Sequence, residues 1–406
     1  MPNRIALAYS GGLDTSCIIP WLLENHPGCE VIAVVGDVGQ DDDALSTVEA
    51  KALRTGAAQC HIVDLKREFI EDFAFPTLMA GSLYESRYLL GTAIARPILA
   101  RAQVDVALQT GCDALAHGCT GKGNDQVRFE SAYAALAPEL QVIAPWRTWK
   151  LRGREDLLAY LRTHNIPTTA SAEKIYSRDA NLWHISHEGG ELEDPWNAPP
   201  EDIWMRTCSP QSAPALPEDV MIGFENGRPR SIDGQPMAGD ELVAALNQRA
   251  GRHGIGRVDL IENRLVGMKS RGCYETPGGT VLYEALQGLT QLVLDHKTVQ
   301  LREWLGARFA DAVYNGEWFT PQREILWAAI EKMAERLTGD IVVRMHRGTA
   351  TTIKRRSENS LFSQEFATFS ADEVYNQQHA EGFIRLYSLP SRIAALKANQ
   401  PQGVSH

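Results

Sequence analysis

The chain has 406 residues, of which 44% are hydrophobic and 22% charged, a balance that excludes a disordered protein and gives enough length for two domains. Its 51 acidic and 40 basic side chains give a net charge of −11, so its field would repel nucleic acid and anionic membranes, and we expect neither as a partner. The seven cysteines are scattered and have no C-x-x-C spacing, so we expect neither disulfides nor a zinc ribbon. We also find no room for a signal peptide and no apolar run of membrane-spanning length, and we therefore expect a cytoplasmic protein.

The first part of the chain alternates short β-branched runs with longer helical runs. In chain order we expect a strand at 5–10, a helix at 16–25, a strand at 30–35, a helix at 43–55, a strand at 60–65, a helix at 91–111, a strand at 114–118, a helix at 126–137 and a strand at 141–145. Pro97 should bend the start of the long helix. Because the strands are apolar on both faces, residues 1–165 are expected to form an α/β domain with a doubly wound parallel sheet.

The pattern changes after a proline-rich stretch at 195–217, which breaks both periodicities and is expected to wrap a surface. Asn226 and Gly227 stand between two strand-like runs and predict a hairpin. Helices are expected at 239–249 and, as one long helix, at 279–305. Residues 166–365 are therefore expected to form a second, α+β domain. Residues 366–406 are expected to form a C-terminal tail whose helix after Pro390 serves oligomerisation.

The stretch YSGGLDTS lies where the first expected strand leads into the first expected helix. Gly11 and Gly12 let backbone N–H groups approach an anion, the hydroxyl side chains add donors, and the helix start adds partial positive charge. Neither G-x-x-x-x-G-K-S/T nor G-x-G-x-x-G spacing is present, and the loop has no lysine, which argues against transfer of a γ-phosphoryl group. A turn that ends in a helix cap would explain the same residues without a ligand.

The stretch HGCTGKGNDQVRFE follows the fourth expected strand and opens a helix, so we expect it at the same sheet edge as the glycine loop. Lys122 and Arg128 are cations, whereas Asn124 and Asp125 can bind an ammonium group; an amino acid, which carries both charges, suits this mixture. Alternatively, Asn124 or Asp125 is a helix cap and Lys122 a solvated surface charge. The histidine and cysteine of the stretch have no partners at zinc spacing, and we expect no protein metal site there.

Four stretches in the same order along residues 4 to about 290 carry a family resemblance: AYSGGLDTSC, YLLGTAIARP, HGCTGKGNDQVRFE and ENRLVGMKSRGCYETPGGT. The first resembles the SGGxDS loop of the ATP pyrophosphatase type, in the adenine nucleotide alpha hydrolase-like superfamily, where the loop holds the two phosphates that leave ATP together. Together the four resemble the argininosuccinate synthase family. The resemblance implies a carbon–nitrogen ligase of arginine biosynthesis that uses ATP and Mg²⁺ and forms a homotetramer.

The implied reaction has two steps. The ureido oxygen of citrulline attacks the α-phosphate of ATP, giving a citrullyl-adenylate and pyrophosphate, and the amine of aspartate then displaces AMP. Adenylation is needed because the ureido oxygen is otherwise a very poor leaving group. Positioning and charge stabilisation are what remain for the protein. We expect Asp14, Asp125 and Arg128 to take part in catalysis, with Asp14 approaching the metal.

The resemblance also assigns ligands to positions of this chain. The resemblance implies that ATP lies against the glycine loop, its flanking residues and two further glycines: Ala8, Tyr9, Ser10, Gly11, Gly12, Leu13, Asp14, Thr15, Ser16, Gly36 and Gly118. Aspartate is expected at Thr120, Asn124 and Asp125. Citrulline is expected at polar positions in both parts of the chain: Tyr88, Thr92, Asn124, Arg128, Ser177, Ser186, Glu262 and Tyr274. A guanidinium suits the carboxylate of citrulline, and a glutamate suits its ammonium or ureido end.

Several of these positions also have ordinary structural explanations. Tyr88 and the two serines could be surface or cap residues, and Glu262 and Tyr274 could lie on the solvated face of a hairpin. The family often has a serine after Gly-Thr in the second motif, where this chain has Ala93. Either Thr92 supplies that hydroxyl or the contact is absent.

Two other functions use the same kind of loop, namely adenylation of a tRNA base and non-catalytic nucleotide or arginine sensing. The acidic net charge and the lack of C-x-x-C spacing argue against the first, and the retained polar residues of both clusters argue against the second. A further glycine-rich stretch at 251–256 follows an expected helix, so we interpret it as a helix end and turn without a ligand.

Overall fold

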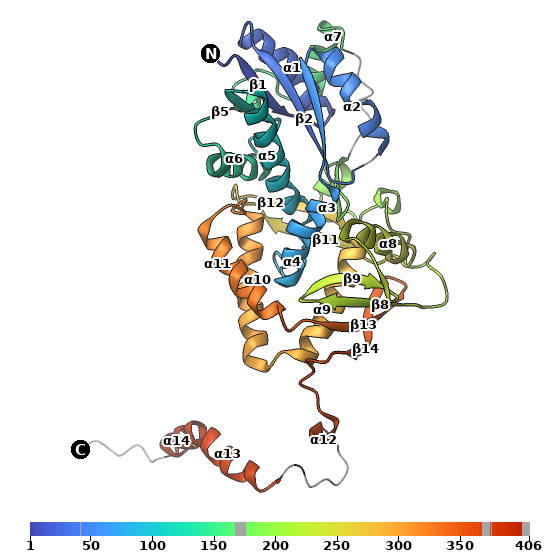
Figure 1. Cartoon of the computed structure of the whole chain (residues 1–406), viewed down its shortest axis with the longest axis vertical. Coiled ribbons are helices and arrows are strands. Elements are labelled where there is room, and N and C mark those ends of the chain that lie inside the picture. Colours follow the sequence, from blue (N-terminus) through green and yellow to red (C-terminus); the bar gives the residue numbers. More distant parts are fainter. Residues whose placement is uncertain (41, 167–175, 368–373, 375, 400–406) are drawn as a thin grey trace, which may run out of the picture. The chain divides into compact units, whose positions relative to one another are not determined.

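Figure 1 shows the fold of the computed structural model, which describes all residues except 41, 167–175, 368–373, 375 and 400–406. The described chain forms two compact units, Met1–Asn359 and Ser360–His406. The first unit contains three β-sheets and their covering helices. The described residues of the second unit form short helices.

The first sheet is parallel, as the alternating pattern predicts, and has the strand order β3-β2-β1-β4-β5. Its strands are β1 (Arg4–Ala8), β2 (Glu30–Asp37), β3 (Gln59–Asp64), β4 (Ala114–Ala116) and β5 (Gln141–Ile143). The chain runs outward from β1 through β2 to β3, then returns to pair β4 with the free side of β1. Because the order reverses between β1 and β4, the loops that follow these two strands lie next to each other, where α/β sheets bind ligands.

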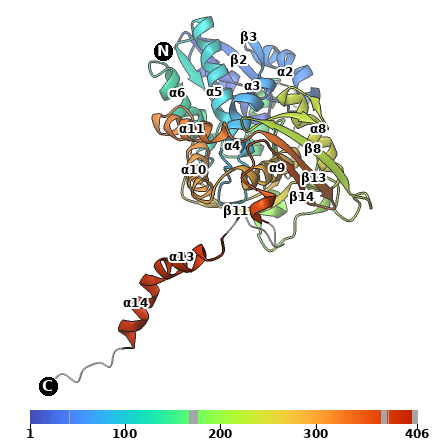
Figure 2. The same cartoon turned by 60° about the horizontal axis from the view of Figure 1, so that its bottom comes forward.

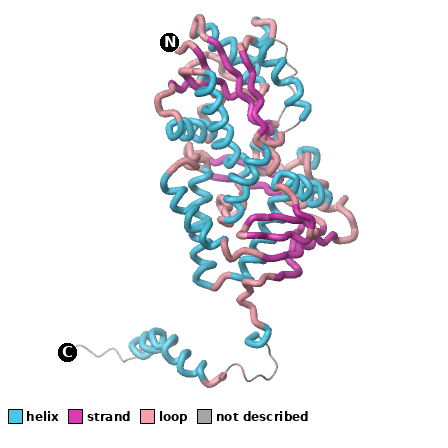
Figure 3. The backbone as a smooth tube through the Cα atoms, in the orientation of Figure 1, coloured by secondary structure: helices cyan, strands magenta, loops and turns pink. Residues whose placement is uncertain are grey.

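Helices cover both faces of this sheet, so the doubly wound arrangement is confirmed (Figure 3). They are α1 (Leu13–Asn25) and α2 (Asp42–Thr55) on one face and α5 (Gly91–Thr110) and α6 (Asp125–Leu136) on the other, with α7 (Arg154–Thr163) packed on α1. Alternate residues of β1 supply the two cores, since Leu7 packs with Ile18 of α1 whereas Ala6 packs with Val104 of α5.

Two antiparallel sheets make up the later part of the first unit, as expected for an α+β region. One has the order β10-β9-β8-β13-β14, with β8 (Glu218–Glu225), β9 (Arg228–Ile232), β10 (Gln235–Pro236), β13 (Gly339–His346) and β14 (Thr349–Arg356). The other has the order β11-β12-β7-β6, with β6 (Ser177–Ala180), β7 (Ile185–Glu188), β11 (Arg257–Asn263) and β12 (Lys269–Glu275). Helices α8 (Gly239–Arg252), α9 (Pro277–Val293), α10 (His296–Tyr314) and α11 (Pro321–Ala334) pack with them.

One hydrophobic core joins the two parts of the first unit. Ile94 and Ile98 of α5 belong to the same buried cluster as Leu282 and Leu286 of α9. The segment between β3 and α5 also enters this core; it consists of α3 (Lys66–Glu68), a π-helical turn (Phe69–Ala74) and α4 (Phe75–Met79). The parallel sheet and the antiparallel sheets are therefore packed together through apolar contacts.

The predicted hairpin between β8 and β9 is confirmed. Glu225 pairs with Arg228, and the two turn residues Asn226 and Gly227 have φ values of +51° and +79°. Asparagine and glycine tolerate these left-handed values better than other residues do, which is why the pair marks such a turn.

The prediction of a single long helix at 279–305 is wrong. The structure has two helices there, α9 and α10, with a break at Leu294 and Asp295. The Asp295 carboxylate accepts hydrogen bonds from the backbone N–H groups of Lys297 and Thr298, at 3.0 and 3.2 Å. A side chain that satisfies the free N–H groups of a helix start stabilises a new helix at that point.

The other expected elements lie within a few residues of the observed ones. The proline-rich stretch is mostly irregular and contains one helical turn, Glu201–Ile203, whose Ile203 side chain is fully buried. Two of the glycines at 251–256, Gly254 and Gly256, have φ values of +68° and +98°, so this stretch does form the turn after α8.

The second unit contains α12 (Gln364–Ala367), α13 (His379–Tyr387) and α14 (Leu389–Ala398). The helix expected after Pro390 corresponds to α14, and Figure 2 shows α13 directly before it. Apolar side chains of both helices are exposed to solvent in the single chain, among them Phe383, Tyr387 and Leu396.

Candidate functional site

The glycine loop leaves β1 and enters α1 with its backbone open to solvent. Gly11 has a φ value of +69°, and Gly12, the residue before the helix, carries no side-chain cap. The Ser10 hydroxyl accepts a hydrogen bond from the Gly12 N–H at 3.3 Å and lies 3.2 Å from the Thr15 hydroxyl. Ser16 donates to the Gly12 carbonyl oxygen at 2.7 Å. The loop is therefore a preformed turn, and the N–H groups at the start of α1, which have no side-chain cap, can meet an anion.

Two ionisable side chains belong to this loop region. Asp14 is half-buried, and burial raises the pKa of its carboxyl group, an effect that its own backbone hydrogen bond and the positive charge of Arg154 oppose. Lys51 of α2 donates a hydrogen bond from its ammonium group to the Gly11 carbonyl oxygen. The cation that the loop sequence lacks thus comes from a helix 40 residues further along the chain.

The remaining residues expected to contact ATP surround the loop. Tyr9 is buried, with its hydroxyl 3.4 Å from that of Ser16. A Cβ atom at Gly118, just after β4, would lie 3.1 Å from the Thr15 side chain, so this glycine lets the second loop approach α1 closely. A Cβ atom at Gly36 would lie 2.3 Å from the Leu99 side chain, so apolar packing already requires glycine there. Ala8 ends β1, and Leu13 is buried against α7.

The second loop connects β4 to α6 and carries an unsatisfied polar atom. The Asn124 amide oxygen is buried and has no hydrogen-bond partner among the described residues, and Asn124 does not cap α6 through its side chain. Lys122 and Thr120 are exposed. A buried oxygen without a donor is costly, so Asn124 is ready to accept a hydrogen bond from a ligand.

His117 and Cys119 both make contacts within the protein. The His117 ring is fully buried, with one nitrogen 2.9 Å from Glu130 and the other accepting a hydrogen bond from the Cys119 N–H at 3.2 Å. In the part of the chain that the structure describes, no group of three or more His, Cys, Asp or Glu side chains is arranged to hold a metal ion.

Four charged side chains form a compact cluster at the start of α6. Arg96 of α5 lies 2.9 Å from one Asp125 oxygen, and Arg128 lies 2.9 Å from the other. Arg96 also forms an ion pair with Asp179 of β6. Burial alone would raise the pKa of Asp125, but the two guanidinium groups outweigh it and lower that pKa to about 2. We call these four residues the arginine–aspartate cluster.

A second cluster holds the Glu262 carboxylate between tyrosines. Glu262 accepts hydrogen bonds from the hydroxyls of Tyr274, at 3.0 Å, and Tyr314, at 2.6 Å. Burial raises the pKa of Glu262, and both hydrogen bonds oppose that shift. The rings of Tyr88 and Tyr274 stack with their centroids 4.5 Å apart. Glu262, Tyr274 and Tyr88 are all buried, which excludes the alternative that they lie on solvated surfaces.

Arg128 joins the two clusters. Its Nε donates to the Tyr314 carbonyl oxygen at 2.8 Å, and its guanidinium lies 4.8 Å from the centre of the Tyr314 ring. Its Nη1 donates to Asp125, whereas Nη2 has no hydrogen-bond partner among the described residues. Those N–H groups are left to bind a carboxylate.

The other residues expected at the citrulline site lie around this junction with different exposure. Ser186 of β7 is buried opposite Tyr274 of β12. Ser177 is exposed on the edge strand β6, and no described contact joins it to either cluster. The Thr92 N–H donates to the Tyr88 hydroxyl at 2.9 Å. Ala93 is fully buried in the core shared with α9, where a methyl group packs without an unsatisfied polar atom.

Sequence analysis missed four residues of this region: Lys51, Arg96, Asp179 and Tyr314. A charged residue inside the apolar run AIARPIL was a signal for Arg96. Tyr314 gave no signal, because it ends a helix far from every motif and reaches the site only through the packing of α10.

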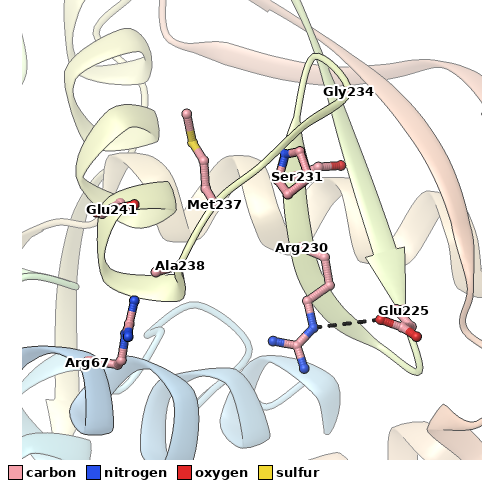
Figure 4. Close-up of a pocket in the computed structure, with 9 residues that line it drawn as sticks. Arg67, Glu225, Arg230, Ser231, Gly234, Met237, Ala238 and Glu241 are labelled. Carbon is pink, nitrogen blue, oxygen red and sulfur yellow. Dashed lines mark ion pairs between the residues drawn. The ribbon is translucent and has the colours of Figure 1, made fainter.

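A shallow surface groove lies elsewhere. Figure 4 shows Arg230 paired with Glu225, and Arg67 and Met237 also line the groove. None of the residues predicted from the sequence to bind a ligand lines this groove. Within the described part of the chain, no helix combines the length and apolar character needed to cross a membrane.

Comparison with known proteins identifies the family. Residues 4–167 match the model of the arginosuccinate synthase N-terminal HUP domain, and residues 176–394 match that of the C-terminal domain. The argininosuccinate synthase of Pseudoalteromonas atlantica is 59% identical over 97% of this chain and 95% of its own. That of Idiomarina loihiensis is 58% identical over 98% of both chains, and that of Psychromonas ingrahamii 59% over 98% of this chain and 99% of its own.

Among solved structures, a tRNA thiolase from Methanococcus maripaludis matches 42% of this chain and 60% of its own, with 17% identity and a TM-score of 0.28. That likeness is too weak to bear on function. The two family models and the near full-length relatives, in contrast, cover both parts of the chain, and the protein belongs to the argininosuccinate synthase family.

Proposed function

We propose that this protein is an argininosuccinate synthase, which joins citrulline to aspartate with ATP and releases AMP and pyrophosphate, a reaction of arginine biosynthesis. The observation that carries the proposal is the junction at Arg128, where polar side chains from α6, α10, β11 and β12 meet. The loop that leads into α6 also approaches the glycine loop, where Gly118 lies against Thr15. The junction offers a carboxylate site and an ammonium site, and the glycine loop offers a phosphate site, which the three substrates need.

ATP is assigned to the loop from Ala8 to Ser16, with Gly36 and Gly118 beside it. The uncapped N–H groups at the start of α1 and the Ser10 and Thr15 hydroxyls would hold the terminal phosphates, which leave as pyrophosphate. The close approach of Gly118 to Thr15 supports an arrangement in which both loops border one nucleotide. Held in this way, the α-phosphorus is open to attack by the ureido oxygen, and the bond to pyrophosphate breaks.

Magnesium belongs to this site as part of the ATP substrate. Mg²⁺ binds proteins through one or two carboxylates and takes its other oxygens from phosphate and water. Asp14, the carboxylate of the loop, fits that donor set without further protein ligands. When bound there, the ion neutralises charge on the triphosphate.

Citrulline is assigned to the junction of the two clusters. Arg128 would bind its carboxylate through the free Nη2 group, and Glu262 would bind its ammonium group, with Asn124 Oδ1 as a further acceptor. Tyr88, Thr92, Ser186 and Tyr274 would line the same space, and Ser177 would contribute from the edge strand.

Aspartate is assigned next to citrulline, at Thr120, Asn124 and Asp125. Asn124 is shared by the two amino acids, and Asp125 contacts the arginine that binds citrulline. This adjacency suits the second step. The aspartate ammonium first gives a proton to water, the free amine attacks the ureido carbon, the new C–N bond forms as the bond to AMP breaks, and the nitrogen releases a second proton to water. Asp125 keeps its negative charge at neutral pH, because its pKa is about 2, and can attract the ammonium form of the incoming substrate.

We assign ATP binding to residues 1–165, the second α+β domain to residues 166–365 and assembly to residues 366–406. The exposed apolar side chains of α13 and α14 support a homotetramer in which these helices bind other subunits. All seven cysteines are free thiols, which supports a reducing cytoplasm. The mass in solution should fall when residues after Asp372 are removed, and an unchanged mass would contradict the role of the tail.

The decisive experiment is an assay with ATP, citrulline and aspartate in which each substrate is omitted in turn. All three together should yield AMP, pyrophosphate and argininosuccinate in equal amounts. ATP consumption that is as fast without citrulline would contradict the two-step scheme. Retention of tRNA in a filter-binding test would instead favour adenylation of a tRNA base.

A further inference from the structure

The glycine loop rests directly on helix α2. A Cβ atom at Gly11 would lie 3.0 Å from the Val48 side chain, and one turn further along α2 the Lys51 ammonium donates to the Gly11 carbonyl oxygen. Residues three apart on a helix lie on the same face. The face of α2 that carries Val48 and Lys51 is therefore the face that supports the loop.

The contact with Lys51 also orients the loop. In a trans peptide the carbonyl oxygen and the following N–H point in opposite directions. Because the Gly11 oxygen is turned toward Lys51, the Gly12 N–H points away from it, toward the Ser10 hydroxyl at 3.3 Å. The Gly12 N–H is thereby held by Ser10, and the N–H groups that follow it at the start of α1 have no side-chain cap.

The Lys51 ammonium has no counter-ion among the described residues. It is half-buried, and burial lowers its pKa. Among the described residues, the charge interactions on it come from Cys17 and from Arg54, which is positive and disfavours protonation. The Cys17 thiol is buried and its pKa is raised to about 12, so it is neutral near pH 7. A half-buried cation that has no acidic partner among the described side chains is unfavourable there, and an anion bound at the loop would relieve it.

We propose that Lys51 is a phosphate-binding residue of this site, whose ammonium group binds the terminal phosphates of ATP and then the pyrophosphate that leaves. One N–H of the ammonium holds the Gly11 carbonyl oxygen, and the others remain for phosphate oxygens. A lysine from α2 thus takes the place of the lysine that other phosphate loops carry within their own sequence. This inference rests on the proposed function, since it assumes that ATP occupies the loop.

Three substitutions separate the charge of Lys51 from its hydrogen bond. Lys51→Gln keeps a donor without charge, Lys51→Met removes both, and Lys51→Arg keeps the charge. Arg54→Met removes an exposed cation from the same helix and is the matched control. The ligands are inorganic pyrophosphate, α,β-methylene-ATP and AMP, with affinities measured by calorimetry on the full-length protein.

Lys51→Gln and Lys51→Met should each weaken the binding of pyrophosphate and of α,β-methylene-ATP by about 10- to 100-fold, the effect of losing a charge-assisted hydrogen bond. AMP, which lacks the terminal phosphates, should bind to these variants as it binds to the parent protein. Lys51→Arg should retain most of the affinity for pyrophosphate, and Arg54→Met should retain all of it. In steady-state assays the KM for ATP should rise, while those for citrulline and aspartate should not.

The inference is overturned if Lys51→Gln binds pyrophosphate as tightly as the parent protein. It is equally overturned if AMP and pyrophosphate lose affinity together, because Lys51 would then act only by holding the fold of the loop. If Lys51→Met does not fold, the glutamine and arginine variants still decide the matter. A parent protein that binds pyrophosphate but makes no argininosuccinate would contradict the proposed function and leave this inference standing.

Discussion

Arg96 lies 2.9 Å from Asp125 and pairs at the same time with Asp179, so one guanidinium joins α5, α6 and β6. The Arg96 side chain is only 13% exposed. Removing one partner of a largely buried ion pair leaves an uncompensated charge. The arrangement therefore ties the start of α6, where the second loop ends, to the sheet that carries Ser186.

Arg96→Met should lower the free energy of unfolding by about 3 kcal/mol, because two carboxylates lose their shared cation. The measurement is urea unfolding followed by circular dichroism. Arg101→Met is the control, since Arg101 lies on α5 like Arg96 and pairs with Glu68 of α3, but both side chains of that pair are more exposed. It should lower the stability by less than about 1 kcal/mol. Equal losses in the two variants would contradict a special role for Arg96.

Asp125→Asn should impair the use of aspartate more than the activation of citrulline. The amide keeps the size of the side chain but removes the charge that attracts the aspartate ammonium, so kcat/KM for aspartate should fall by about 30- to 100-fold. Citrulline-dependent exchange of pyrophosphate into ATP, which reports the first step alone, should fall much less. If both rates fall equally, the assignment of Asp125 to the aspartate site is wrong.

Tyr314→Phe should raise the KM for citrulline by about 5- to 10-fold, because Glu262 loses its 2.6 Å hydrogen bond and is less firmly oriented. The KM for ATP should stay the same. Tyr160→Phe removes a similar hydrogen bond, 2.7 Å long, to Glu24 on α1 and should leave both constants unchanged. An unaltered KM for citrulline in Tyr314→Phe would remove Tyr314 from the site.

The Glu130 carboxylate should contribute to the pH dependence of stability. The hydrogen bond with His117 lowers its pKa, with the help of Arg147 and against the effect of burial, from 4.5 to about 2. Because the folded state holds this proton less tightly than the unfolded state, the contribution is complete above about pH 4.5 and is lost as the pH falls toward 2.

In Glu130→Gln, the free energy of unfolding should therefore be lower at pH 7 and should decrease less between pH 5 and pH 3. The difference from the parent protein at pH 7 should be about 1–2 kcal/mol, allowing for partial exposure of the carboxylate. Urea unfolding at a series of pH values measures it. Glu139→Gln, at an exposed position shortly after α6, is the control; parallel curves for Glu130→Gln and the parent would refute the prediction.

The parallel sheet could be predicted from the sequence because its signals are local. Each strand is a short apolar run, and each ligand loop follows a strand directly, as at Gly11 and Gly118. The same reasoning failed at Asp295, where a single capping side chain divides one apolar helical pattern into two helices. Helical patterns lie on both sides of that break, and the cap residue marks the point that divides them.

The site could be predicted only where its residues stand within motifs. The positions of Asp125 and Arg128 follow from one loop, but their partners do not. Arg96 reaches Asp125 from another helix, and Tyr314 reaches Glu262 across 52 residues of chain. Contacts of this kind depend on how helices pack, which no local pattern encodes.

The core that α5 shares with α9 affects how the chain folds during its synthesis on the ribosome. During synthesis the whole parallel sheet leaves the ribosome before residues 277–293 do, so Ile94 and Ile98 lack the leucines of α9 during that interval. The newly synthesised first half is thus exposed to self-association until the second half arrives. Slowing translation between the two halves would lengthen that period of risk.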